Sequence, residues 1–220
     1  MGAKIEFYFL VKGDTEAILE TCSKVLRKQE WTYNHHVQGE YTVWLDGPIW
    51  MLGKSRTIRE DERAIGSGTL NPVLTKLTDG FSPSVVLGTA WFEEPLPAVL
   101  GIAEGEGAWK QLTFSVDWHE AFGRLATKEK GTATEKFKTL FAELARRTQA
   151  YYGLGGIELM GIEAEPKLID ESSLVADFIF FSRTMVEDRT IQIGRQEYFV
   201  QDEVDGSVLL FRKDRFLEHA

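Results

Sequence analysis

The first thirty residues show two hydrophobic periods, one after the other. Lys4–Val11 is rich in Ile, Phe and Tyr and partly alternates, which predicts a β-strand. Asp14 then stands as a helix N-cap, with Glu16 in the first turn, and predicts a helix to about Gln29. The apolar positions of this helix fall at i, i+4, i+7 and i+8, on one face: Ile18, Cys22, Val25 and Leu26.

The longest amphipathic pattern covers Thr132–Tyr152 and predicts a helix laid on a core. Basic side chains lie off its apolar face, which repeats at helical spacing through Phe137, Leu140, Phe141, Leu144, Thr148 and Tyr151. We expect the glycines that follow, Gly153 and Gly155–Gly156, to end this helix in left-handed conformations.

The middle of the chain contains short β-favouring runs separated by turn residues. Residues 41–45 and 49–52 flank Asp46–Gly47–Pro48 and predict a hairpin. The mixed charges of residues 56–63 fit either a short helix or a solvated loop, and Asn71–Pro72 predicts a short helix over residues 70–79. Further strands are predicted over residues 84–91, 99–103 and 111–118, of which the last alternates as Leu112, Phe114, Val116 and Trp118.

Two more β-favouring regions close the chain. Residues 172–183 predict a strand, and residues 198–200 and 207–212 flank Asp205–Gly206, which is typical of a type I′ hairpin turn. The order of elements is β, α, several β, α and several β. This order predicts a single α+β domain over residues 1–220, a mostly antiparallel sheet with two main amphipathic helices packed on it.

Charge is distributed unevenly along the chain, which has a net charge of −9 and a pI near 5.1. Residues 93–120 hold six acidic residues against Lys110, and residues 151–180 hold six against Lys167. Residues 124–147 instead hold seven basic and three acidic residues. Because nucleic acids and anionic membranes are bound through Lys and Arg, we expect neither as a partner. Segregated acid favours a basic partner.

The single cysteine and the N-terminus indicate the compartment. Cys22 excludes an intrachain disulfide, and its place on the apolar helix face predicts a buried structural thiol. The opening residues, MGAKIEFYFLVKGD, have no signal-peptide pattern, and no run of about twenty apolar residues follows. We therefore expect a protein of the reducing cytoplasm.

Candidate catalytic chemistry is sparse. If residues 117–120 continue a strand, Asp117 and His119 share a face and offer two metal ligands or a base with its orienting carboxylate. Glu120 follows directly and is a further acidic candidate. The simpler interpretation is an acidic turn after a strand, because no third and fourth ligand stand at metal-site spacing. Serine and cysteine nucleophile patterns are absent from the sequence. We expect no catalytic residue, no metal and no cofactor.

Acidic residues in two predicted loops remain as candidate binding residues. Carboxylates on such loops, with aromatic anchors beside them, are typical of surfaces that contact a basic partner, although a solvated loop needs no partner. These candidates are Glu93, Glu94, Glu104 and Glu106, with Trp91, Phe92 and Trp109 as the apolar anchors.

Several short strings, in their order along the chain, resemble the bacterial Immunity protein 52 family. They are Trp91–Pro95 (WFEEP), the helix ending at Tyr152 before a Gly-rich stop, Phe180–Arg183 (FFSR) and Val204–Phe211 (VDGSVLLF), with the opening strand and its Asp14-capped helix. The resemblance covers nearly the whole chain. It implies a non-enzymatic antidote, encoded beside a polymorphic or type VI secreted toxin, that binds its cognate toxin, often a nuclease.

Three hypotheses follow from the sequence. The first is an immunity protein that binds a basic toxin through its acidic loops and neutralises it. The second is a small metal-dependent hydrolase that uses Asp117, His119 and Glu120. The third is a regulatory module that binds a small ligand. The sequence leaves the toxin and the oligomeric state open.

Overall fold

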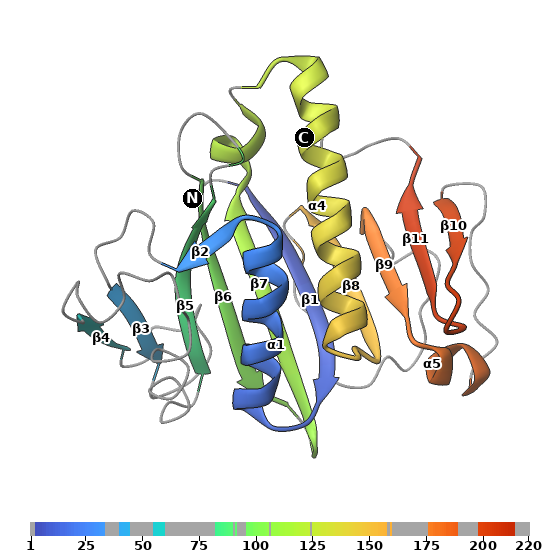
Figure 1. Ribbon diagram of the computed structural model, residues 1–220, viewed down its shortest axis with the longest axis horizontal. Helices are drawn as coiled ribbons and strands as arrows, with labels where there is room; N and C mark the ends of the chain where they lie inside the picture. The colour runs from blue at the N-terminus through green and yellow to red at the C-terminus, as the bar shows by residue number, and fades with distance from the viewer. Residues whose placement is uncertain are drawn as a thin grey trace.

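A single sheet organises the protein in the computed structural model (Figure 1). The residues described by the structure are 3–33, 40–44, 55–59, 82–89, 91, 96–105, 107–123, 125–157, 159, 176–188 and 198–213. The strands are β1 Lys4–Lys12, β2 Trp31–Tyr33, β3 Glu40–Trp44, β4 Ser55–Arg59, β5 Ser82–Thr89, β6 Leu96–Glu104, β7 Trp109–Asp117, β8 Tyr152–Ile157, β9 Phe178–Phe181, β10 Tyr198–Asp202 and β11 Val208–Arg212. The helices are α1 Thr15–Lys28, α4 Thr127–Arg147, α5 Arg183–Asp188 and a π-helical turn, η1 His119–Gly123.

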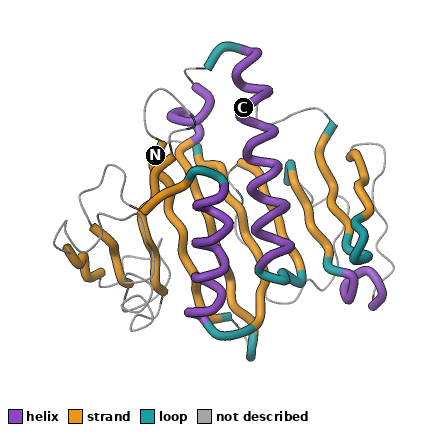
Figure 2. Tube along the Cα trace, in the orientation of Figure 1, coloured by secondary structure: helices purple, strands orange, loops and turns teal. Residues whose placement is uncertain are grey.

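The strands form one sheet in the order β10-β11-β9-β8-β1-β7-β6-β5-β3-β4, and β2 also pairs with β5. Every described pairing is antiparallel. Helices α1 and α4 lie side by side in front of the same face of the sheet (Figures 1 and 2). The predicted α+β class is therefore confirmed. Within the described residues, no helix is both long enough and apolar enough to cross a membrane.

Strand β1 lies at the centre of the sheet because both of its faces are apolar. Ile5, Phe7 and Phe9 point into the large core beneath the helices, while Leu10 belongs to a second core on the other face. Phe7 stacks on Phe114 of β7, its cross-strand partner, with ring centroids 5.5 Å apart. Such aromatic cross-strand pairs stabilise the pairing register.

Helix α1 begins where the sequence predicts. The Asp14 side chain accepts a hydrogen bond of 3.0 Å from the backbone N–H of Ala17, which satisfies one of the free N–H groups at the helix start. Cys22 is fully buried on the inner face, and burial raises the pKa of its thiol to about 12. The prediction of a structural thiol is confirmed, because a thiol that stays protonated is a poor nucleophile.

Helix α4 ends earlier than predicted, and the glycines after it have another role. Its C-cap is Thr148, and Gln149 takes the left-handed conformation with φ of 52°. Gly153 and Gly155 instead lie inside β8, in the middle of the sheet, so their predicted role as helix caps is wrong. A Cβ on Gly155 would stand 2.9–3.0 Å from the rings of its neighbours Phe178, Phe141 and Phe7. The missing side chain lets α4 approach the sheet.

Several strand predictions need correction. β3 pairs with β4, so residues 55–59 form a strand and neither a short helix nor a loop. β6 begins at Leu96, three residues before the start of the strand predicted over residues 99–103. β7 ends at Asp117, one residue earlier than predicted, although Trp118 still packs against the large core as its place in the alternation predicts. The turn between β10 and β11 is longer than type I′, because the Gly206 N–H bonds to the Glu203 carbonyl and positive φ is found at Gly206 and not at Asp205.

Other predictions fall outside the described residues or differ from the structure in extent. The predicted turn at 46–48, the strand at 49–52 and the helix at 70–79 lie outside the described residues. Of the predicted strand over 172–183, the structure describes residues from 176 onward, where β9 ends at Phe181 and α5 begins at Arg183. Ser182 lies between β9 and α5, and its hydroxyl accepts a hydrogen bond of 3.2 Å from the Met185 N–H in the first turn of α5.

Candidate functional site

The structure places three of the seven predicted binding residues. Trp91, Glu104 and Trp109 are described, whereas Phe92, Glu93, Glu94 and Glu106 lie outside the described residues.

Trp91 is half-buried and packs against the large core. Its indole N–H donates a hydrogen bond of 2.7 Å to the Gln29 carbonyl, at the end of α1. Its ring meets Trp31 and Phe137 edge to face, with centroids 5.1 Å and 5.4 Å apart. These contacts fix the end of α1 against α4, which gives Trp91 a structural task in addition to any contact with a partner.

Glu104 and Trp109 lie together at the hairpin between β6 and β7. The Glu104 carboxylate forms an ion pair with Lys110, its cross-strand partner. The Trp109 ring is half-buried against Tyr151, and the ammonium group of Lys12 lies 3.8 Å from its centroid. A lysine therefore lies beside each of these two predicted contact residues. The two positive charges partly offset the acidic residues at this end of the sheet.

Trp91 does not share a surface with this hairpin. It packs on Trp31, whose cross-strand partner Thr89 is in turn paired with Leu96 at the start of β6. Glu104 is at the other end of β6, which at about 3.3 Å per residue spans roughly 26 Å. The predicted aromatic and acidic residues are thus divided between two ends of the sheet.

The Asp117, His119 and Glu120 group does not form the strand face that we expected. β7 ends at Asp117, and His119 begins the π-helical turn η1. An Asp117 carboxylate oxygen accepts a hydrogen bond of 3.1 Å from the Glu120 backbone N–H, so Asp117 caps this turn. The described residues contain no group of three or more His, Cys, Asp or Glu placed to hold a metal ion.

A different region stands out for its exposed apolar side chains. Among the described residues, the exposed large hydrophobic side chains are Phe199, Val200 and Val204, at 62%, 37% and 109% exposure. All three lie on the hairpin β10–β11, and β10 is the last described strand at that edge of the sheet. Sequence reasoning missed them. The available signal was two consecutive apolar residues, Phe199 and Val200, in a predicted hairpin strand, where alternation would place one face outward.

The exposure of Phe199 has a clear origin in the sheet. One cross-strand row runs Phe7, Gly155, Phe178, Phe211, Phe199 across β1, β8, β9, β11 and β10. In Figure 1, β11 and β10 lie to the side of α4, beyond the helix layer. Phe178 and Phe211 are still buried, whereas Phe199 at the end of the row is not. The apolar row therefore continues past the helix that covers it.

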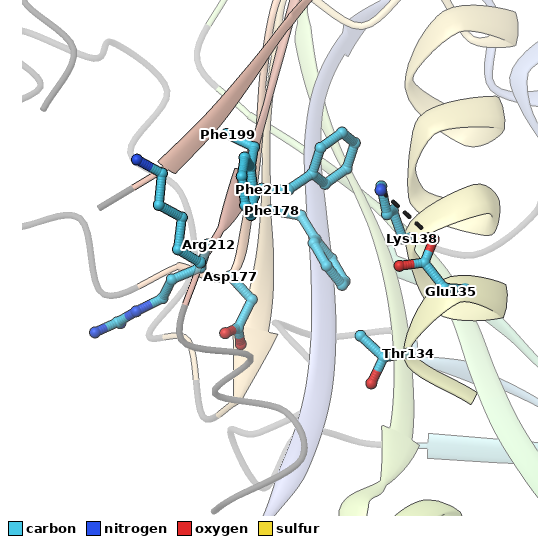
Figure 3. A pocket seen from close by; sticks show the side chains of 9 residues that line it. Thr134, Glu135, Lys138, Asp177, Phe178, Phe199, Phe211 and Arg212 are labelled. Carbon is cyan, nitrogen blue, oxygen red and sulfur yellow. Dashed lines mark ion pairs between the residues drawn. The ribbon is translucent and has the colours of Figure 1, made fainter. Parts of the chain in front are cut away.

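A hollow of about 110 Å³ opens beside this row, between α4 and the C-terminal strands (Figure 3). It is lined by aromatic rings and by charged or polar side chains: Phe178, Phe199 and Phe211, with Thr134, Glu135, Lys138, Asp177, Arg212 and Lys213. The Lys138 ammonium lies 4.3 Å from the Phe211 centroid, and that of Lys213 lies 5.5 Å from the Phe199 centroid. Pockets for drug-sized ligands begin at roughly 300 Å³. This hollow is the size of one side chain.

The turn of the same hairpin is acidic and is held by hydrogen bonds of its own. Asp205 accepts hydrogen bonds from the Ser207 hydroxyl at 2.6 Å and the Ser207 N–H at 3.0 Å. These bonds hold the pKa of Asp205 below its usual value, so its exposed carboxylate is charged at neutral pH. Glu203 is instead engaged by Arg146 of α4, at 2.7 Å. This ion pair joins the hairpin to α4.

Comparison with known proteins assigns no family. No family model matches the sequence, and no curated protein matches it. A solved structure that resembles the fold is the Pseudomonas aeruginosa T6SS protein PA0821, with a TM-score of 0.47 and 12% identity over 99% of this chain and 72% of that chain. Similarity at this level assigns neither family nor activity. The resemblance to the Immunity protein 52 family thus stays a hypothesis.

Proposed function

We propose that this protein is an immunity protein that binds and neutralises a cognate secreted bacterial toxin by direct protein–protein contact. The observation that supports this most is the C-terminal hairpin β10–β11, which exposes Phe199, Val200 and Val204 at one end of the sheet. Gathered apolar exposure of this kind is typical of interaction sites, whereas single exposed apolar residues are ordinary.

The surroundings of Phe199 suit a protein partner. A large aromatic side chain next to a hollow of side-chain size offers an anchor and a receptor in one place, as energetically dominant interface residues do. Strand β10, which carries Phe199, is held in place by its buried residue Tyr198. The Tyr198 hydroxyl donates a hydrogen bond of 2.8 Å to the Ala176 carbonyl. A rigid contact surface loses little conformational entropy on binding, which favours affinity.

The class of partner follows from the charge of the chain and from the sequence resemblance. With a net charge of −9, the protein attracts basic partners and accelerates their association. The resemblance to the Immunity protein 52 family implies a toxin, often a nuclease, and nucleases are basic where they meet phosphate. We therefore propose a basic nuclease toxin encoded next to this protein, inhibited in the producing cell.

Co-expression with the toxin domain encoded by the neighbouring gene tests this function directly. The wild-type protein is expected to restore growth, and the two purified proteins are expected to form a 1:1 complex by size-exclusion chromatography with light scattering. Failure of both growth rescue and complex formation would reject the immunity role.

The hairpin surface is tested in the same assay. Phe199→Ala is expected to weaken the complex by more than about tenfold, as for an aromatic anchor. Thr139→Ala on α4 is the matched control, because Thr139 is also exposed and its hydroxyl bonds only within its own helix, to the Glu135 carbonyl. Equal affinity of both variants would move the contact surface away from this hairpin.

A further inference from the structure

We infer that the hollow between α4 and the C-terminal strands receives one tyrosine side chain of the partner protein. This inference rests on the proposed function, because it names the kind of toxin side chain that this surface would take. The hollow, of about 110 Å³, has room for a single side chain, and every residue that lines it is described by the structure.

The strand side of the hollow is aromatic. Phe178, Phe211 and Phe199 belong to one cross-strand row, and all three line the hollow (Figure 3). The rings of Phe178 and Phe211 already meet edge to face, with centroids 6.0 Å apart. Aromatic pairs in such arrangements contribute more than the burial of their area alone. A ring supplied by the partner would extend this row, which favours an aromatic occupant over an aliphatic one.

The helix side of the hollow contains a buried hydroxyl group. Thr134 of α4 is 9% exposed, and its Oγ1 atom has no hydrogen-bond partner among the described residues. Its side chain projects from α4 toward the strands (Figure 3). Thr139 and Thr148, by contrast, each donate to the carbonyl oxygen four residues earlier. A buried hydroxyl without a partner costs free energy, which a polar group bound in the hollow would recover.

The charges around the hollow favour a neutral occupant. Five charged side chains of both signs line it: Lys138, Arg212, Lys213, Glu135 and Asp177. A lysine or arginine would meet the ammonium groups of Lys138 and Lys213, which lie over rings of the aromatic row. A carboxylate would instead be brought beside Asp177, which is 2% exposed. Burial of a charge next to a like charge is unfavourable in either case.

Tyrosine combines the properties that these three observations require. Its ring extends the aromatic row, its phenol is neutral at neutral pH, and its hydroxyl both donates and accepts hydrogen bonds. Phenylalanine and leucine would leave the Thr134 hydroxyl without a partner. Tyrosine is also among the residues that dominate the binding energy of protein interfaces. The basic residues proposed for the toxin would then lie around the hollow and not inside it.

Binding of p-cresol, the side chain of tyrosine, to the full-length protein tests the inference without any toxin. Toluene, the side chain of phenylalanine, is the matched probe, because it lacks only the hydroxyl. An NMR titration is expected to show saturable shifts at the amides of Thr134, Phe178 and Phe211. The affinity for p-cresol is expected to be about 3–10-fold higher than that for toluene, as one additional hydrogen bond provides.

Thr134→Val separates the hydroxyl from the shape of the hollow. It is expected to lower the affinity for p-cresol to that for toluene. It is expected to leave the free energy of unfolding undiminished, because the hydroxyl has no partner to lose among the described residues. Thr139→Val is the matched control on the same helix, since Thr139 is exposed and its hydroxyl bonds to the Glu135 carbonyl. The affinity of this control for p-cresol is expected to equal that of the wild type.

Three results would overturn the inference. They are the absence of saturable p-cresol binding, equal affinities for p-cresol and toluene, and an unchanged p-cresol affinity in Thr134→Val. Because these measurements need no toxin, their failure is distinct from a failure of growth rescue, which concerns the immunity role itself.

Discussion

Phe199 and Phe211 are direct cross-strand partners on β10 and β11, yet Phe211 is 7% exposed and Phe199 is 62% exposed. The same residue type, one strand apart, changes from core to surface because the helix layer ends between them. Phe211 still contacts Phe178, with ring centroids 6.0 Å apart, and Lys138 of α4 covers its ring. The pair therefore separates a stability role from a binding role.

Replacing each member of this pair with alanine should have very different effects on the stability of the protein. Phe211→Ala is expected to lower the free energy of unfolding by about 3–5 kcal/mol, because it leaves a cavity beside Phe178. Phe199→Ala is expected to change it by less than about 0.5 kcal/mol, because its side chain is mostly in water. Urea denaturation of the two variants measures both values. Similar losses would contradict the division of roles.

Gly155 is expected to tolerate no side chain. Gly155→Ala would bring a methyl group to 2.9–3.0 Å from three phenylalanine rings and is expected to cost about 1–3 kcal/mol of stability. Adding Phe141→Leu to Gly155→Ala should recover part of this loss, because Phe141 of α4 is one of the three neighbours. The double variant is compared with each single variant by denaturation. Strictly additive losses would show that Phe141 does not limit the space.

Acid should weaken the C-terminal hairpin through Asp205. Its folded-state pKa is lowered below the usual 3.8, first by the Ser207 hydroxyl. The stabilisation is therefore complete above the unfolded-state value and is lost as the pH falls through the folded-state value. Ser207→Ala is expected to raise the pKa of Asp205, which an NMR titration of its carboxyl carbon measures. An unchanged titration would disprove the role of this hydroxyl.

The predicted acidic contact at the β6–β7 hairpin is tested by charge reversal. Glu104→Lys is expected to weaken toxin binding roughly threefold at low salt and less at high salt, because exposed charges are screened. Glu20→Lys is the matched control, since Glu20 is also exposed and also pairs with a lysine, Lys24, at 2.8 Å. Equal affinities for both variants at low salt would remove this hairpin from the interface and leave the immunity role intact.

The alternative of a metal-dependent hydrolase is tested at His119. Because Asp117 caps η1 and His119 is exposed on that turn, His119→Ala is expected to rescue growth as well as the wild type. Metal content of the purified protein, by mass spectrometry, accompanies the growth assay. Stoichiometric metal that is lost in the variant, together with loss of rescue, would favour the hydrolase.

The local elements of the central sheet and of both main helices followed from the sequence alone. Asp14 caps α1 as predicted, and Leu112, Phe114 and Val116 alternate into the core as predicted. These features depend on neighbours in the chain, through hydrogen bonds within one turn and through the period-2 and period-3.6 patterns. The strand at 55–59 escaped prediction because its mixed charges have no clear period, and its pairing with β3 is what makes it a strand.

Tertiary structure alone decided which residues are exposed together. The sequence grouped Trp91 with Glu104 and Trp109 because they are close along the chain, but a whole strand separates them in space. The sequence predicted that Gly155 helps to end a helix, whereas Gly155 lies in the sheet and the close approach of Phe141 requires a glycine there. From the sequence, nothing distinguished the exposure of Phe199 from that of Phe211, since both lie in predicted strands of the same hairpin. Only the end of the helix layer, set by long-range packing, leaves Phe199 in water as the proposed contact.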